Sequence, residues 1–142
     1  MYRVLTASIM LLLASPGYSQ DEIVGLWKPN EGSTIVEIFQ KESGQYAGKV
    51  VWLEEPADKK GVPHKDKMNP DKSLRDRNLL GIEMLENLEY RDGKWNGTLY
   101  SPKKGRKVNA VLTINAGNQL DVNVSFRGFT KKLVWTRTAL PE

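Results

Sequence analysis

Hydrophobic and polar residues alternate with a period of two along most of the chain. Leu120, Val122 and Val124, for example, are each followed by a polar residue. Strands with one apolar and one polar face are typical of antiparallel sheets that meet water on one side. Turn residues such as Arg91-Asp92-Gly93 separate the alternating runs. The pattern predicts eight strands, near residues 23–28, 33–40, 45–53, 80–89, 95–100, 106–114, 119–126 and 132–138.

Eight short antiparallel strands predict an all-β fold, an antiparallel up-and-down eight-stranded barrel. The second face of the strands carries polar residues, including Lys49, Lys107 and Asp121. An outer-membrane barrel would need an apolar outer face instead. We therefore expect a water-soluble barrel with its apolar face inward. Eight strands enclose just enough space to be filled by side chains or to hold one small ligand, and the pattern leaves both outcomes open.

One connection is long. Residues 54–79 carry Pro63, Pro70 and alternating charges. A loop of this length inside a compact domain is usually functional or disordered. We expect a helical turn from Pro70 to Arg75, because Asn69 is a good N-cap and proline fits the first helical position.

The N-terminus has the pattern of an export signal. Arg3 precedes an uncharged, mostly apolar run over residues 4–14, and Gly17 and Ser19 are small residues at the positions that a signal peptidase requires. The run is shorter than the roughly 20 residues of a membrane-spanning helix. We predict a signal peptide over residues 1–19 and a single β-barrel domain over residues 20–142. The mature protein is then periplasmic or secreted, without a membrane span.

The amino-acid composition excludes most familiar kinds of catalytic site. The 142 residues include no cysteine and one histidine, His64. Disulfides, thiolate metal sites and cysteine nucleophiles are excluded, and a catalytic triad or multi-histidine site would depend on His64 alone. The spacing of Asp66, Asn69 and Asp71 lacks the glycine and the distal glutamate of a calcium loop. We expect no enzyme activity, no metal and no cofactor.

Two separated elements resemble the lipocalin pattern. Gly25-Leu26-Trp27 opens the first predicted strand, and Arg137 ends the last one. In lipocalins a Gly-x-Trp at the closed end of the barrel packs against an arginine of the final strand. The resemblance implies structural roles for Gly25, Trp27 and Arg137, with the guanidinium stacked on the indole.

A longer resemblance covers about the whole mature chain. The sequence is similar to the exported bacterial family called domain of unknown function 2147, whose members look like small lipocalin-like barrels. The matching segments are residues 23–27, 46–53, 66–71, 75, 77, 80–82, 95–102, 105 and 135–137. Ser101 replaces the aspartate that is more frequent in the family, and Val108 replaces an aromatic residue. The resemblance implies a lipocalin-like fold but no settled activity.

Basic residues gather at the predicted open end. If the Trp27 end is closed, the connections 29–32, 54–79, 101–105 and 127–131 surround the mouth. Residues 101–142 contain eight basic and two acidic residues, whereas residues 20–100 contain 12 basic and 15 acidic residues. A cleft of low dielectric ringed by positive charge attracts anions.

These observations favour an exported binding protein for a small apolar or anionic amphipathic ligand, such as a fatty acid, held through a basic mouth. The predicted ligand-binding residues are Tyr46, Trp52, Leu99, Val108, Phe126, Leu133, Lys103 and Arg127. A second polar patch lies on the long loop and consists of Asp66, Asn69, Asp71, Arg75 and Arg77. This patch either orders the loop through Arg–carboxylate pairs or contacts a ligand head group.

Two other interpretations stay open. A filled barrel would indicate a non-catalytic envelope module that binds a protein partner through residues 54–79 and the outer faces. An enzyme built on the loop would depend on His64, Asp66 and Asn69. Export argues against a nucleic-acid partner despite the basic composition. The sequence predicts no oligomeric state.

Overall fold

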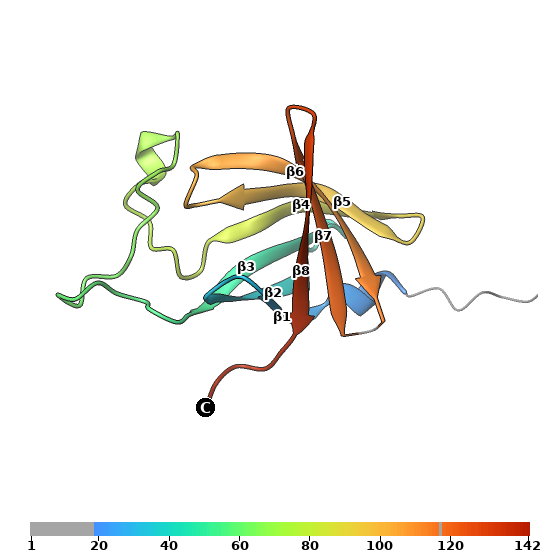
Figure 1. The fold of residues 1–142 in the computed structure, drawn as a ribbon, viewed down its shortest axis with the longest axis horizontal. Helices are drawn as coiled ribbons and strands as arrows, with labels where there is room; N and C mark the ends of the chain where they lie inside the picture. Colours follow the sequence, from blue (N-terminus) through green and yellow to red (C-terminus); the bar gives the residue numbers. More distant parts are fainter. Residues whose placement is uncertain (1–18, 117) are drawn as a thin grey trace, which may run out of the picture.

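The structure is a computed structural model that describes residues 19–116 and 118–142. Nearly all of the predicted signal peptide therefore lies outside the described residues. Eight antiparallel strands close into one barrel, in which each strand pairs with the next and β8 pairs with β1 (Figure 1). The strands are β1 (Gly25–Pro29), β2 (Thr34–Gln40), β3 (Tyr46–Leu53), β4 (Glu83–Arg91), β5 (Lys94–Ser101), β6 (Arg106–Asn115), β7 (Gln119–Phe126) and β8 (Phe129–Arg137).

The predicted up-and-down barrel is confirmed, and all eight strands lie near their expected positions. The only helices in the described residues are two short 3-10 turns, η1 (Gln20–Ile23) and η2 (Lys72–Leu74). No helix in this part of the chain is long and apolar enough to cross a membrane.

The helical turn of the long loop is shorter than predicted and has a different cap. Asp71 caps η2 by accepting a hydrogen bond from the backbone N–H of Ser73. Asn69 does not act as the N-cap, because its side-chain oxygen accepts from the backbone N–H of Asp71 and its amide nitrogen donates to Asp66.

Trp27 closes the narrow end of the barrel. Its indole is fully buried, and Nε1 donates a 2.8 Å hydrogen bond to the carbonyl of Ile23 in η1. The Arg137 guanidinium lies 4.2 Å from the Trp27 ring centroid and donates to the carbonyls of Glu22 and Val24. The contact that the lipocalin resemblance implied between the first and last strands is therefore present.

The half of the barrel next to the closed end is filled by packed side chains. Trp95 and Trp135 are buried with Trp27, and Trp95 Nε1 donates to the carbonyl of Gln20. Tyr46 is also buried in this cluster, and its hydroxyl donates to Asp21 at 2.5 Å. Burial, together with the bond to Asp21, raises the pKa of Tyr46 to about 12. Tyr46 therefore belongs to the closed end and not to the mouth.

A β-bulge changes the expected alternation in one strand pair. The register between β2 and β3 shifts between Ile35 and Val36. Trp52 follows this shift, and the centroid of its ring lies 5.7 Å from the ammonium of Lys28. Lys28 is exposed and its neighbour Trp27 points into the core, so Trp52 shares the outer face with Lys28. The simple period-two pattern had placed Trp52 on the inner face.

Candidate ligand site at the barrel mouth

The long loop is ordered against the open end of the barrel. Isolated bridges pair Ala57 with Pro63 and Lys65 with Asn78, and the backbone N–H of Leu79 donates to the carbonyl of His64. The loop therefore doubles back on itself. The backbone of Met68 in this loop lies so close to Gly105, in the β5–β6 turn, that a Cβ on that glycine would lie 1.9 Å from the Met68 carbonyl.

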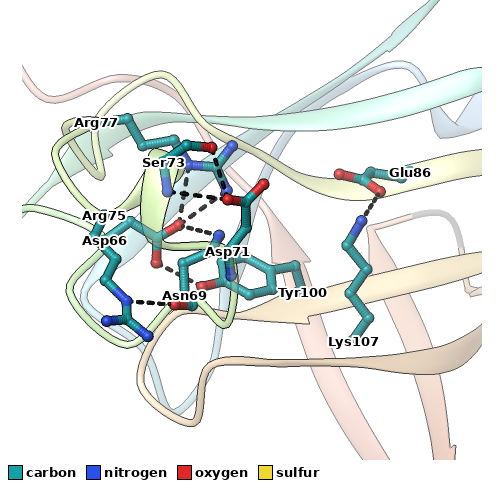
Figure 2. A network of polar contacts seen from close by, with 9 residues as sticks. All are labelled: Asp66, Asn69, Asp71, Ser73, Arg75, Arg77, Glu86, Tyr100 and Lys107. Atoms are coloured by element: carbon teal, nitrogen blue, oxygen red, sulfur yellow. Dashed lines mark hydrogen bonds and ion pairs between the residues drawn. The ribbon is translucent and has the colours of Figure 1, made fainter.

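Asp66 fastens this loop to the barrel wall (Figure 2). Asp66 is 1% exposed, and its carboxylate accepts hydrogen bonds from Tyr100 Oη at 2.5 Å and Asn69 Nδ2 at 2.8 Å. Arg77 donates through Nε at 3.0 Å and Nη2 at 2.9 Å. Because Tyr100 belongs to β5, the cluster joins residues distant in the chain. We call Asp66, Asn69, Arg77 and Tyr100 the loop latch.

The electrostatics of the loop latch follow from burial and from these bonds. Burial alone would raise the pKa of Asp66, but the hydrogen bonds from Asn69, Tyr100 and Arg77 outweigh it and hold that pKa below its ordinary value. For Tyr100, burial and the adjacent carboxylate raise the pKa of the phenol to about 12. The folded state therefore favours an ionised Asp66 beside a neutral Tyr100.

Members of the polar patch predicted on the loop bond to one another within the protein. Arg77 forms the expected ion pair with Asp66, whereas Arg75 donates to the carbonyl of Asn69 at 2.7 Å and is absent from the ion pairs among the described residues. Across the described residues, every buried side-chain nitrogen and oxygen has a hydrogen-bond partner. No group of three His, Cys, Asp or Glu residues there could hold a metal ion. Tyr100 was missed, since its position at the end of a strand gave no sign of a partner in the loop.

A cavity of about 380 Å³ opens at the mouth between β5, β6, β7 and β8. Its deeper wall is apolar and continues the barrel core, because Leu99, Val108, Val124 and Leu133 all pack against the buried cluster. The lining residues are Leu99, Ser101, Lys104, Arg106, Val108, Val124, Ser125, Phe126, Phe129, Thr130, Lys131 and Leu133.

The outer rim of this cavity is cationic. The Arg106 guanidinium lies 4.8 Å from the Phe126 ring centroid, and Arg127 lies 5.1 Å from the same centroid. The ion pairs found in the described residues do not include Lys104 or Arg106, whereas Lys107 on β6 pairs with Glu86 at 2.9 Å (Figure 2). Lys104 and Arg106 thus offer positive charge that none of these ion pairs neutralises.

Four of the predicted ligand-binding residues line this cavity: Leu99, Val108, Phe126 and Leu133. The other four do not. Tyr46 lies at the closed end, and Trp52 lies beside Lys28. Lys103 lines a wider cleft of about 850 Å³ between the long loop and the β1–β2 connection. Arg127 sits in the β7–β8 turn, where it contacts the Phe126 ring without lining the cavity.

Sequence reasoning omitted several residues that line the cavity. Ser101, Val124 and Phe129 are among the lining residues. Two of them could have been found from the alternation, since Ser101 is two residues beyond Leu99 and Val124 is two residues before Phe126. Phe129 gave no such signal, because its position depends on the two-residue turn that joins β7 and β8.

The fold and the position of the cavity define a lipocalin-like barrel. A solved structure with a similar fold is protein HP1028 from the human pathogen Helicobacter pylori, which is described as belonging to the lipocalin family. The two share a TM-score of 0.67 at 23% identity, over 82% of this chain and 83% of that chain. A search of curated proteins found no match. Residues 25–137 match the family described as uncharacterized protein conserved in bacteria (DUF2147), and the chain belongs to this family.

Proposed function

We propose that this protein is an exported, non-catalytic carrier that binds a small anionic amphipathic molecule, such as a fatty acid, in the mouth cavity. The observation that carries the proposal is the pairing of an apolar wall with a cationic rim in one cavity. A lipocalin-like fold is compatible with small-molecule binding, but it does not identify the ligand.

The dimensions of the cavity support a single small ligand. Its volume of about 380 Å³ lies within the roughly 300–1,000 Å³ of typical small-molecule sites. The packed tryptophans below it limit its depth, so the ligand's apolar part ends at the level of Leu99 and Leu133. An extended long-chain lipid would leave part of its tail exposed.

The rim supports a negatively charged head group. Lys104 and Arg106 both line the cavity, and a guanidinium or ammonium at the edge of an apolar cavity attracts an anion more strongly than it would in open water. A carboxylate or phosphate at this level could reach both cations while its apolar tail contacts Val108 and Val124.

The proposed compartment rests on the N-terminal pattern. Removal of residues 1–19 would release the barrel into the periplasm or the medium, where amphipathic molecules need a carrier to cross aqueous space. The absence of cysteine agrees with this placement, because no thiol would be exposed to oxidation.

Native mass spectrometry of the mature protein, purified from its own exported compartment, tests the proposal. We expect a bound mass that is lost on unfolding, and fragmentation would then give its chemical class. A ligand-free mass that persists after incubation with fatty acids and lysophospholipids would contradict the proposal and favour the alternative in which the barrel binds a protein partner.

A further inference from the structure

The β7–β8 hairpin presents an exposed aromatic side chain at its tip. Phe129 is 81% exposed, more than any other large hydrophobic residue among those described. The turn consists of Arg127 and Gly128, both with positive φ (49° and 82°), which is the geometry of a tight type I′ hairpin. In Figure 1 the tip stands clear of the rest of the barrel. A stiff hairpin thus holds a phenyl ring in water.

Basic residues flank Phe129 in the chain, and carboxylates are scarce in this segment. Arg127, Lys131 and Lys132 are all exposed, and residues 122–137 include no acidic residue. The ion pair found at the tip joins Lys131 to Glu31 at 4.0 Å, with both side chains mostly exposed. Such a pair contributes little, so the charge of the tip is available to an external partner.

We infer that this tip docks the protein onto an anionic phospholipid bilayer. In this interaction the Phe129 ring enters the interfacial region, and Arg127 and Lys132 contact lipid phosphates. An aromatic residue flanked by basic residues suits the boundary between head groups and acyl chains, and each basic side chain near an anionic surface adds to the attraction.

The shape of the tip favours a bilayer over a protein partner. A specific protein interface commonly buries about 800 Å² on each side, and it needs a matching pocket for a protruding ring. A hairpin tip with a single apolar side chain offers much less area. A bilayer surrounds whatever enters it, so a convex tip can be buried there without a preformed pocket.

Docking through the tip would bring the mouth cavity to the membrane surface. Phe129 and Lys131 belong to both the hairpin and the cavity lining. An amphiphile could therefore pass between the lipid surface and the cavity without crossing bulk water. This consequence rests on the proposed function, whereas the docking itself does not.

Flotation with vesicles tests the docking. The mature protein would be mixed at low salt with vesicles of phosphatidylcholine alone, or with vesicles containing about one third phosphatidylglycerol. We expect binding to the anionic vesicles only, and loss of that binding at high salt. Phe129→Ala should weaken binding roughly tenfold or more, since the apolar insertion is removed. The double variant Arg127→Gln/Lys132→Gln should abolish it.

Matched controls separate docking at the tip from general attraction by net charge. Arg91→Gln/Lys94→Gln removes the same charges at the β4–β5 turn, on the closed end, and Leu140→Ala removes an exposed apolar side chain near the C-terminus. Both should bind vesicles as the wild type does. No binding of the wild type to anionic vesicles, equal loss in the closed-end variant, or wild-type binding by Phe129→Ala would overturn the inference.

A narrowed cavity keeps this test independent of the proposed function. Val108→Phe reduces the space for a ligand deep in the mouth and leaves the hairpin tip unchanged. We expect this variant to dock normally even where it no longer holds a ligand. Loss of docking by Val108→Phe would show that vesicles are bound through the cavity and would contradict docking through the tip.

Discussion

The hydroxyl of Tyr100 donates a 2.5 Å hydrogen bond to Oδ1 of Asp66, and this bond joins the barrel wall to a loop residue 34 positions earlier in the chain. Asp66 is almost fully buried, yet its carboxylate is saturated by donors from Tyr100, Asn69 and Arg77. The loop latch explains how a connection rich in proline and charge is held in one arrangement beside the mouth.

Removing the Tyr100 hydroxyl should destabilise the long loop more than the barrel. We expect Tyr100→Phe to reduce the free energy of unfolding by about 2 kcal/mol, because a hydrogen bond to a buried charged group is lost. Asp66→Asn should cost about 3 kcal/mol, because Arg77 loses its buried ionic partner. Urea unfolding measures both values.

Hydrogen exchange identifies where the effect of Tyr100→Phe falls. Amides of residues 64–79 should exchange faster, while those of β6 and β7 should change little. Ser73→Ala is the control, since Ser73 is exposed and its hydroxyl donates to Asp71, which is not part of the loop latch. Uniform acceleration across the barrel in Tyr100→Phe would contradict a local latch.

The free energy of unfolding should fall at alkaline pH because Tyr46 and Tyr100 are held neutral in the folded protein. Tyr46 and Tyr100 have a pKa of about 12 in the folded protein, against an ordinary value of 10.0. The fold favours the neutral phenols, so their contribution is complete below pH 10 and is lost as the pH rises from 10 towards 12. The double variant Tyr46→Phe/Tyr100→Phe should lack this decline when urea unfolding is compared between pH 8 and pH 11. An equally steep decline in the double variant would assign it to other groups.

Two features favour glycine at position 25 in the closed end, namely its backbone conformation and the closeness of Arg137. Its φ is +136°, and a Cβ there would lie 3.0 Å from Nη1 of Arg137. We expect Gly25→Ala to lower the free energy of unfolding by about 2 kcal/mol. Gly44→Ala is the matched control, because Gly44 also has a positive φ but open space around it. An equal loss at both sites would show that the Arg137 contact adds nothing.

The alternation of the sequence predicted the barrel well because each strand buries one face. It failed where the register changes. The bulge at Ile35/Val36 moved Trp52 away from its expected face, and no turn residue in the sequence marks that bulge. Tyr46 was assigned to the ligand site although its strand begins at the closed end.

The site was only partly predictable for a related reason. Leu99, Val108 and Phe126 follow from strand order, since each lies near the open end of its strand, whereas Leu133 lies at the middle of β8. The bond between Tyr100 and Asp66 could not be foreseen, because the path of a long loop is set by tertiary contacts that leave no periodic pattern. Phe129 depends on a two-residue turn whose position was expected only within a wider connection.

Narrowing the mouth should weaken ligand binding without loss of folding. Val108 is only partly buried and lies near the mouth end of β6, so we expect the barrel to tolerate Val108→Phe. The larger ring would occupy part of the cavity, and we expect affinity for decanoate to fall roughly tenfold. Calorimetric titration measures this, with Val111→Ile on the same strand as the control, since Val111 does not line the cavity. Undiminished affinity in Val108→Phe would place the ligand elsewhere.

The most direct test of the account compares decanoate with decanol by calorimetric titration at low salt. The cationic rim predicts that decanoate binds roughly tenfold more tightly than decanol, and that Lys104→Gln/Arg106→Gln removes this preference while leaving decanol binding unchanged. Equal affinity for the acid and the alcohol in the wild-type protein, or no binding of either, would contradict the claim that the mouth cavity holds an anionic amphiphile.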